Sequence, residues 1–342
     1  MSASLAAPTG VPVSGTPLLR RSGRAARAGA GLLQVLVQTG AVFLIASFLT
    51  FALGAVSGAS PAASALGETA TEADIVRLNH EFGLDQPFLV RYVVWLGSAL
   101  TGDLGTSWFT NIPVAQSIGQ RLPVSASIAA FALLLAIVVG VTAGIIAALN
   151  RGRLIDRLIT GVCSFLSTIP AFVAGIALII VFALLIPIFP TGGYVPPQVS
   201  VPLWLGSLVL PAVALSLDAT ADITRQLRTG LVSTLQENYV TGAVVRGLSR
   251  PRIVVEHALR NAAGPAIAVV GLHLPRLIGG AVITEVVFAM PGLGQLASES
   301  ALKGDVPVVQ GSLLVAVGIV LASSIVVNVA LQRLSPGGRA GL

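Results

Sequence analysis

Residues 125–149 of this chain read SASIAAFALLLAIVVGVTAGIIAAL, a run without a single charged side chain. A helix rises about 1.5 Å per residue, so about 20 such residues cross the roughly 30 Å hydrocarbon core of a bilayer. Backbone groups inside lipid must be hydrogen-bonded within the protein, and only a helix does this within one segment. This run therefore predicts a membrane-spanning helix and sets the class of the fold.

The rest of the chain follows the same pattern. Its 342 residues are 54% hydrophobic and only 10% charged, with a mean hydropathy of +0.90. Ordinary soluble domains carry about 25% charged residues. Six runs are long and apolar enough to span, or nearly so; they lie at about 32–53, 125–149, 158–188, 205–223, 262–288 and 309–331. We predict an all-α membrane protein with six transmembrane helices, the fourth continuing as helix to about Leu235.

The basic residues set the orientation, because cytosolic loops carry an excess of Lys and Arg. Placing the N-terminus in the cytosol puts fifteen of the twenty basic residues on that side. They are Arg20, Arg21, Arg24, Arg27, Arg151, Arg153, Arg157, Arg225, Arg228, Arg246, Arg250, Arg252, Arg260, Arg333 and Arg339. Both termini are thus predicted to be cytosolic. These residues lie scattered in short loops and form no continuous stripe, so the net charge of +6 does not indicate nucleic-acid binding.

The chain divides into a tail, one transmembrane domain and a second tail. Residues 1–28 have no apolar period and predict a disordered basic cytosolic tail, followed by the transmembrane domain at 29–335 and a cytosolic tail at 336–342. The pair Arg20-Arg21 ahead of an apolar run could instead begin a signal peptide. That run is longer than the roughly 7–15 residues of a signal core, which favours a retained first helix.

The first loop, residues 54–122, predicts an extracytoplasmic cap with its own order. Thr71-Glu-Ala-Asp74 resembles a capping box that opens a helix. A second helix follows Pro87, and Gly102-Asp-Leu-Gly105 is typical of a turn. Such a cap lies where a receptor or substrate would approach, although a passive lid over the bundle would have the same sequence features.

A polar stretch between the fourth and fifth runs, residues 236–260, predicts a helix-rich cytosolic loop. It contains Tyr239-Val-Thr-Gly-Ala-Val-Val-Arg-Gly247. A chain that only had to cross the bilayer could use a short turn here. We therefore interpret the loop as a docking surface for a partner protein.

Motifs for independent catalysis are missing. The three histidines form no HExxH spacing, and the chain has neither GxSxG nor the GxxxxGK[ST] loop of ATPases. The single cysteine, Cys163, lies inside an apolar run. We therefore predict a protein that is not an enzyme and that holds no cofactor and no metal of its own.

Four polar side chains lie inside the fourth and fifth runs, where a charge costs roughly 2.5–3.5 kcal/mol and normally faces a cavity or a partner. Asp218 and Asp222 share one helix face, and His273 and Arg276 share another. We predict that the four line a translocation pathway. An Asp–Arg pair that only locks two helices, a cytosolic position for Asp222, or a metal site at Asp218, Asp222 and His273 are the alternatives.

Two further features predict structural roles. Glu285 precedes a Pro-Gly turn and is placed to hydrogen-bond the amides of the following loop. The glycine pairs Gly54/Gly58 and Gly140/Gly144 have the GxxxG spacing of closely packed membrane helices.

Three blocks resemble the membrane permease subunit of oligopeptide, dipeptide and nickel ATP-binding-cassette importers. They are Phe82–Tyr92 with Gly102–Gly105, Tyr239–Arg250, and Ile278–Gly294 with Asp305–Gly311. The likeness covers about residues 31–331. The loop at 241–247 reads TGAVVRG where the family usually has RTARAKG, so two positive positions are lost.

The resemblance implies a permease subunit in a bacterial cytoplasmic (inner) membrane that imports peptides, nickel or a related solute by alternating access. Its partners would be a second homologous permease, two ATPase subunits that bind the ATP, and an extracytoplasmic solute-binding protein, all within membrane lipid. The resemblance places the ATPase contact at Tyr239, Val240, Thr241, Gly242, Ala243, Arg246 and Gly247. A proton-coupled secondary transporter that uses the Asp and His residues as a relay is the alternative, but it would need no docking loop.

Overall fold

The computed structural model describes residues 22–56, 61–66 and 71–334. Within these ranges all regular structure is helical, apart from one isolated bridge between Thr106 and Pro113. The α-helices are α1 (Ser22–Val56), α2 (Pro61–Leu66), α3 (Glu72–Glu81), α4 (Phe88–Leu100), α5 (Val114–Leu149), α6 (Leu154–Leu166), α7 (Ala171–Ile179), α8 (Val201–Thr234), α9 (Asn238–Val245), α10 (Arg250–Arg252), α11 (Leu259–Val287), α12 (Leu293–Lys303) and α13 (Val306–Leu334). Two π-helical segments, η2 (Ile180–Leu185) and η3 (Ile253–Ala258), continue α7 and precede α11.

The chain forms two compact units, residues 1–42 and residues 43–342. The described part of the first unit is the N-terminal portion of α1. Because α1 begins at Ser22, residues 22–28 of the expected tail are helical. Residues 1–21 and the expected tail at 336–342 lie outside the described residues.

Five described helices are long and apolar enough to cross a membrane, and a bent pair of helices makes a sixth when it counts as one span. The five apolar segments are Leu36–Leu53, Val114–Leu149, Val201–Thr234, Ile253–Leu277 and Val306–Val327. They confirm five of the expected spans and the extension of the fourth, since α8 reaches Thr234. The second span begins at Val114, earlier than expected, because α5 continues through Pro123.

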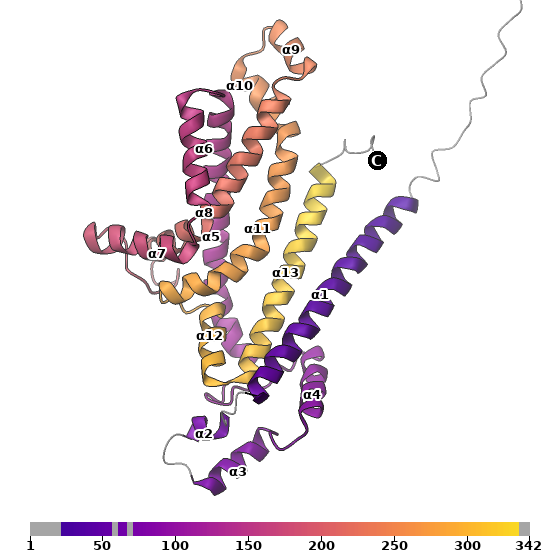
Figure 1. The fold of residues 1–342 in the computed structure, drawn as a ribbon, viewed down its shortest axis with the longest axis vertical. Coiled ribbons are helices and arrows are strands. Elements are labelled where there is room, and N and C mark those ends of the chain that lie inside the picture. The colour runs from indigo at the N-terminus through magenta and orange to yellow at the C-terminus, as the bar shows by residue number, and fades with distance from the viewer. Residues whose placement is uncertain (1–21, 57–60, 67–70, 335–342) are drawn as a thin grey trace, which may run out of the picture. The chain divides into compact units, whose positions relative to one another are not determined.

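The expected third span, residues 158–188, is wrong as a single helix. The chain bends by 102° between α6 and the pair α7–η2. Pro170 supplies no N–H and disfavours helical geometry in the residue before it. The hydroxyls of Ser167 and Thr168 donate back to the carbonyls of Ser164 and Phe165, at 3.1 and 2.7 Å. As a result α7 points away from the helical bundle (Figure 1).

The bundle is built on close contact between α5 and α8. A Cβ atom at Gly140 would lie 2.9 Å from Cβ of Ile223, and one at Gly144 would lie 3.1 Å from Cβ of Leu227. Buried Thr224 donates from Oγ1 to the carbonyl of Gly140 at 3.3 Å. The GxxxG pair at Gly140/Gly144 is thus confirmed as a packing site; in the other pair, Gly58 lies outside the described residues.

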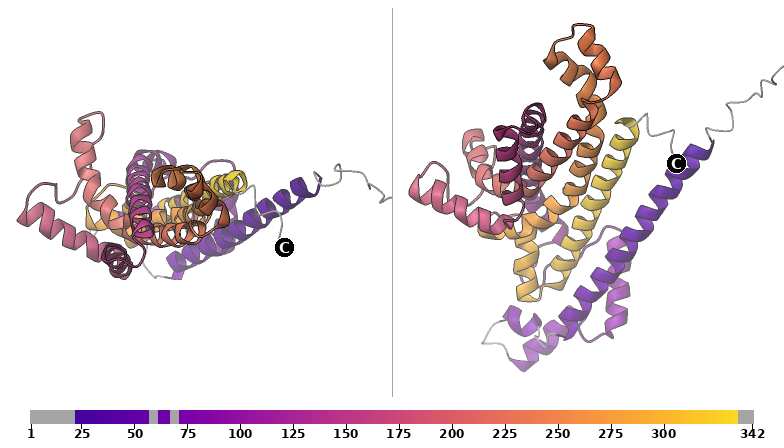
Figure 2. Two further views of the ribbon diagram at one scale, coloured as in Figure 1. Left: turned by 90° about the horizontal axis from the view of Figure 1, so that it is seen from above. Right: turned by 45° about the horizontal axis from the view of Figure 1, so that its top comes forward.

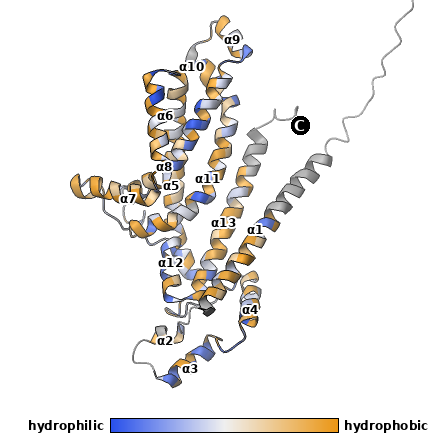
Figure 3. Ribbon diagram, viewed as in Figure 1, coloured by the Kyte–Doolittle hydropathy of each residue, from blue (hydrophilic) through white to orange (hydrophobic). Residues whose placement is uncertain are grey.

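The expected cap is helical. The Thr71 hydroxyl caps α3 by accepting a hydrogen bond from the Asp74 amide at 3.2 Å, as the capping box predicts, and α4 begins after Pro87. Gly102 and Gly105 both have positive φ, which confirms the turn. Helices α2 to α4 lie at the opposite end of the second unit from α9 and α10 (Figures 1 and 2). Hydrophobic residues cover almost all of α7, whereas α3 is largely hydrophilic (Figure 3).

The contact between α5 and α8 predicts that valine substitutions at Gly140 and Gly161 differ sharply in their effect on stability. Gly140→Val should overpack the contact at Ile223 and lower stability by about 1–3 kcal/mol. Gly161→Val on α6 is the control, because a Cβ there meets nothing within 4 Å. Melting temperatures of the purified variants in detergent measure the effect, and equal melting temperatures would contradict the packing argument.

Candidate functional site

The loop between α8 and α11 presents one short helix, α9, on a small core of its own. Val240 and Ala243 are buried and pack with Ile253, Leu235 and Leu248. The Tyr239 hydroxyl accepts a hydrogen bond from the Asn261 amide at 2.8 Å, which ties the start of α9 to α11. The helix is therefore held in place from one side while its other side is free.

The structure divides the seven residues expected to contact the ATPase into two groups. Thr241, Arg246 and Gly247 are exposed, Tyr239 is 41% exposed and Gly242 is half-buried, whereas Val240 and Ala243 face the loop's own core. Sequence reasoning missed Val244 and Val245, which are 58% and 82% exposed. Two adjacent exposed valines on this loop give an apolar surface patch.

The polar side chains of α8 and α11 meet around His273. Nε2 of His273 lies 2.9 Å from Oδ2 of Asp222, and Nδ1 lies 3.9 Å from Oδ2 of Asp218. Asp222 also accepts a hydrogen bond from Arg225, whose Nη1 donates to the Ser167 hydroxyl at 3.2 Å. His273 is 2% exposed, whereas the Asp218 side chain is 52% exposed. We call Asp218, Asp222 and His273 the α8–α11 cluster.

Arg276, the fourth expected pathway residue, is exposed. Arg276 forms no ion pair in the described part of the chain. The alternative of an Asp218–Arg276 pair that locks α8 to α11 is therefore not observed, and His273 contacts the two aspartates instead. A cavity of about 380 Å³ brings Arg276, Asp218 and His273 together. The bend after α6 lines the same cavity through residues 167–171. Irregular backbone at membrane depth is tolerated where it lines a cavity, so the bend and the polar groups belong to one feature.

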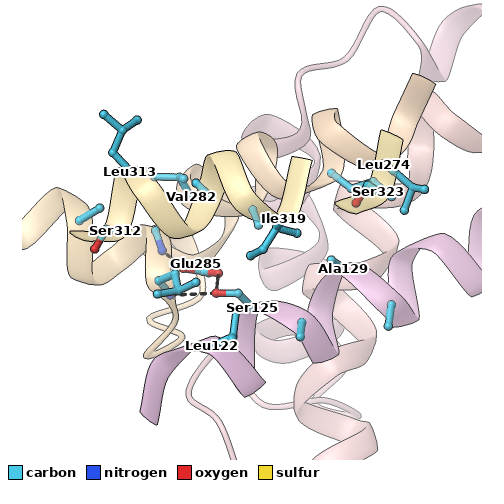
Figure 4. Close-up of a pocket in the computed structure, with 18 of the residues that line it drawn as sticks. Leu122, Ser125, Ala129, Leu274, Val282, Glu285, Ser312, Leu313, Ile319 and Ser323 are labelled. Atoms are coloured by element: carbon cyan, nitrogen blue, oxygen red, sulfur yellow. Dashed lines mark hydrogen bonds between the residues drawn. The ribbon is translucent and has the colours of Figure 1, made fainter. Parts of the chain in front are cut away.

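Glu285 has the structural role that the sequence predicts. Its carboxylate accepts hydrogen bonds from the amides of Gly294 at 2.7 Å and Gln295 at 3.1 Å, and from the Ser125 hydroxyl at 2.6 Å. It thereby caps the first turn of α12, whose N–H groups have no partner inside the helix. Glu285 and Ser125 line an apolar cavity of about 470 Å³ to which α5, α11, α12 and α13 contribute (Figure 4).

At the opposite end of the bundle from α9, Asp305 joins the loop after α4 to the start of α13. It accepts the Ser107 hydroxyl at 2.5 Å and the Trp108 amide at 3.2 Å. Burial raises the pKa of the Asp305 carboxyl above its usual range, against the lowering effect of these hydrogen bonds. Asp305 thus anchors the expected extracytoplasmic cap to the bundle.

Comparison with known proteins gives the family. The model of the binding-protein-dependent transport system inner membrane component matches residues 140–339, and the model of its N-terminal region matches residues 31–129. The chain belongs to this family. It is a membrane permease subunit of the peptide and oligopeptide ATP-binding-cassette importers, and hence a multi-pass inner-membrane protein. Permease subunits of these importers are generally non-catalytic.

Individual relatives agree with this assignment. A "probable peptide ABC transporter permease protein" of Sinorhizobium fredii is 34% identical over 308 residues, covering 90% of this chain and 98% of the relative. A metal-staphylopine import system permease of Staphylococcus aureus is 29% identical and covers 88% and 95%. Among solved structures, an inward-facing MetNI methionine ABC transporter matches with a TM-score of 0.53 and 16% identity, over 64% of this chain and 97% of that chain. That match supports the fold.

The cap formed by Glu285 predicts that removing its carboxylate lowers the stability of the protein, whereas removing the carboxylate of Glu299 does not. Glu285→Ala would leave the amides of Gly294 and Gln295 without their acceptor inside the protein. We expect a loss of about 1–3 kcal/mol, seen as a lower melting temperature in detergent. Glu299→Ala, an exposed position on the same helix α12, is the matched control and should melt like the parent. An unchanged melting temperature for Glu285→Ala would show that water replaces the carboxylate without cost.

Proposed function

We propose that this permease is the translocating subunit of an ATP-driven importer for peptides or a related small solute, working by alternating access. It pairs with a second homologous permease, with two ATPase subunits at the α9 end and an extracytoplasmic solute-binding protein at the α2–α4 end. Both termini then lie in the cytosol. The observation that carries the proposal is the α9 loop, because a loop with its own core and an exposed apolar patch is built to contact another protein.

The mechanism follows from the continuity of α8. This helix runs from Val201 to Thr234 and is followed almost at once by α9. Asp156, which is buried, and Arg228, which is half-buried, form a bidentate ion pair at 2.5 and 2.6 Å that fastens α6 to the same end of α8. When ATP binding closes the ATPase dimer, a displacement of α9 is transmitted to α8 and α6 together. The bundle then changes which side of the membrane its pathway faces.

The α8–α11 cluster and Arg276 are the pathway residues in this proposal. Asp218, His273 and Arg276 supply a carboxylate, an imidazole and a guanidinium to one cavity at the bend of the broken span, and Asp222 contacts His273 at 2.9 Å. Such a lining suits a zwitterionic solute, whose ammonium group faces Asp218 and whose carboxylate faces Arg276. Relatives described as peptide and metal-staphylopine permeases support a solute that carries both charges.

The docking proposal is tested by a charge placed on the exposed valine of α9. Val245→Asp should weaken co-purification of the ATPase at least about tenfold and reduce solute uptake, because it puts a carboxylate into an apolar contact at the cost of its hydration. The melting temperature of the permease should not change, since Val245 is 82% exposed.

Two further variants make the result specific. Val76→Asp, an exposed valine on α3 at the other end of the bundle, should retain the ATPase. Ala243→Asp should lose stability as well as the ATPase, because Ala243 is fully buried in the core of the loop. Normal ATPase co-purification and normal uptake by Val245→Asp would refute α9 as the docking element.

A further inference from the structure

The α8–α11 cluster has the spacing of a metal site. One ligand atom from each of Asp218, Asp222 and His273 can be chosen so that all three lie within 4.8 Å of one another. Asp218 and Asp222 are one helical turn apart on α8, and His273 reaches them from α11. Two helices in contact thus supply three donor atoms within reach of one ion.

The donor types select a class of ion. Two carboxylate oxygens and one imidazole nitrogen suit divalent first-row transition ions such as Co²⁺, Ni²⁺ and Zn²⁺, in contrast to the soft thiolates that select Cu⁺. Three protein ligands leave coordination positions open, which is the arrangement of sites that accept a further ligand.

One carboxylate of the cluster, that of Asp218, is available to a cation. Asp222 is paired with Arg225, whereas within the described ranges Asp218 forms an ion pair with the imidazole of His273 alone, at 3.9 Å. A divalent ion at Asp218 would supply the positive charge that Arg225 supplies to Asp222.

The cluster has one side chain that is fixed in place and another that is accessible from the cavity. The His273 side chain is 97% buried and held by the 2.9 Å contact to Asp222, whereas Asp218 opens onto the cavity at the bend. Arg276 lines the same cavity and forms no ion pair in the described chain, so its guanidinium is available to the carboxylates of a chelating solute.

We propose that Asp218, Asp222 and His273 bind a divalent first-row transition-metal ion in the translocation pathway, with open coordination positions for the donors of a chelator. The cluster would then select metal-bearing solutes. This inference names a ligand for the pathway residues and so rests on the proposed function.

Binding of Co²⁺ alone to the purified full-length permease tests the inference. The protein should carry no polyhistidine tag, and the visible absorption of Co²⁺ together with equilibrium dialysis gives the geometry and the stoichiometry. We expect one Co²⁺ per chain, removed by a chelator. Asp218→Asn and His273→Gln should each weaken binding at least about tenfold.

The control is His80→Gln. His80 also lies 2.9 Å from a carboxylate, that of Asp85, but it is exposed and outside the cluster, so this variant should bind Co²⁺ like the parent. Asp218→Asn keeps the test valid if His273→Gln fails to fold, because the Asp218 side chain is half exposed. Absence of Co²⁺ binding, or binding that survives both cluster substitutions, would overturn the inference. Retained ATPase co-purification in the same preparation would then show that the proposed function stands without it.

Discussion

Lipid offers no hydrogen bonds to a polypeptide backbone, and this constraint explains most of the structure. The chain meets it with long helices whose N–H and C=O groups are paired internally. The one marked departure inside an expected span is the bend after α6, where Pro170 interrupts the helix. That bend lines the cavity that also contains Asp218, His273 and Arg276. The irregular backbone and the ionisable side chains thus line the same cavity. There the polar groups can hydrogen-bond to one another or to a solute in the cavity.

The second organising feature is the central position of α8. It packs against α5 through Gly140 and Gly144, carries Asp218 and Asp222 towards α11, and is fastened to α6 by the Asp156–Arg228 pair. At its end the chain turns into α9. A single continuous helix therefore connects the surface proposed for the ATPase with the residues proposed for the pathway. This is the mechanical requirement for coupling ATP binding to a change of access.

Much of the fold could be predicted from the sequence because hydropathy is a one-dimensional property. The apolar runs gave the spans, Thr71 and Asp74 gave a helix start, and the position of Glu285 before a Pro-Gly turn gave its contacts with the loop amides. The bend at Pro170 was missed because proline is tolerated within membrane helices when neighbours satisfy the freed backbone. Only the packing of the surrounding helices decides between a kink and a break.

The partners of single side chains could not be predicted, because helix rotation is a tertiary property. Asp222 pairs with Arg225, three residues along its own helix, and with His273, while Arg276 stays unpaired in the described chain. The rotation of α9 could not be predicted either. Ala243 was expected at the docking surface and is buried, whereas Val245, which was not expected there, is exposed.

Accessibility of residue 218 tests most directly the claim that ATP-driven movement of α9 and α8 switches the pathway. Asp218→Cys would be made in a Cys163→Ala background, since Cys163 is the only native cysteine. The assembled transporter in vesicles would be labelled with a membrane-impermeant thiol reagent from the cytosolic side, without nucleotide and with ATP trapped. If the pathway switches sides, the labelling rate falls sharply in the ATP-trapped state. An equal rate in both states would contradict the claim.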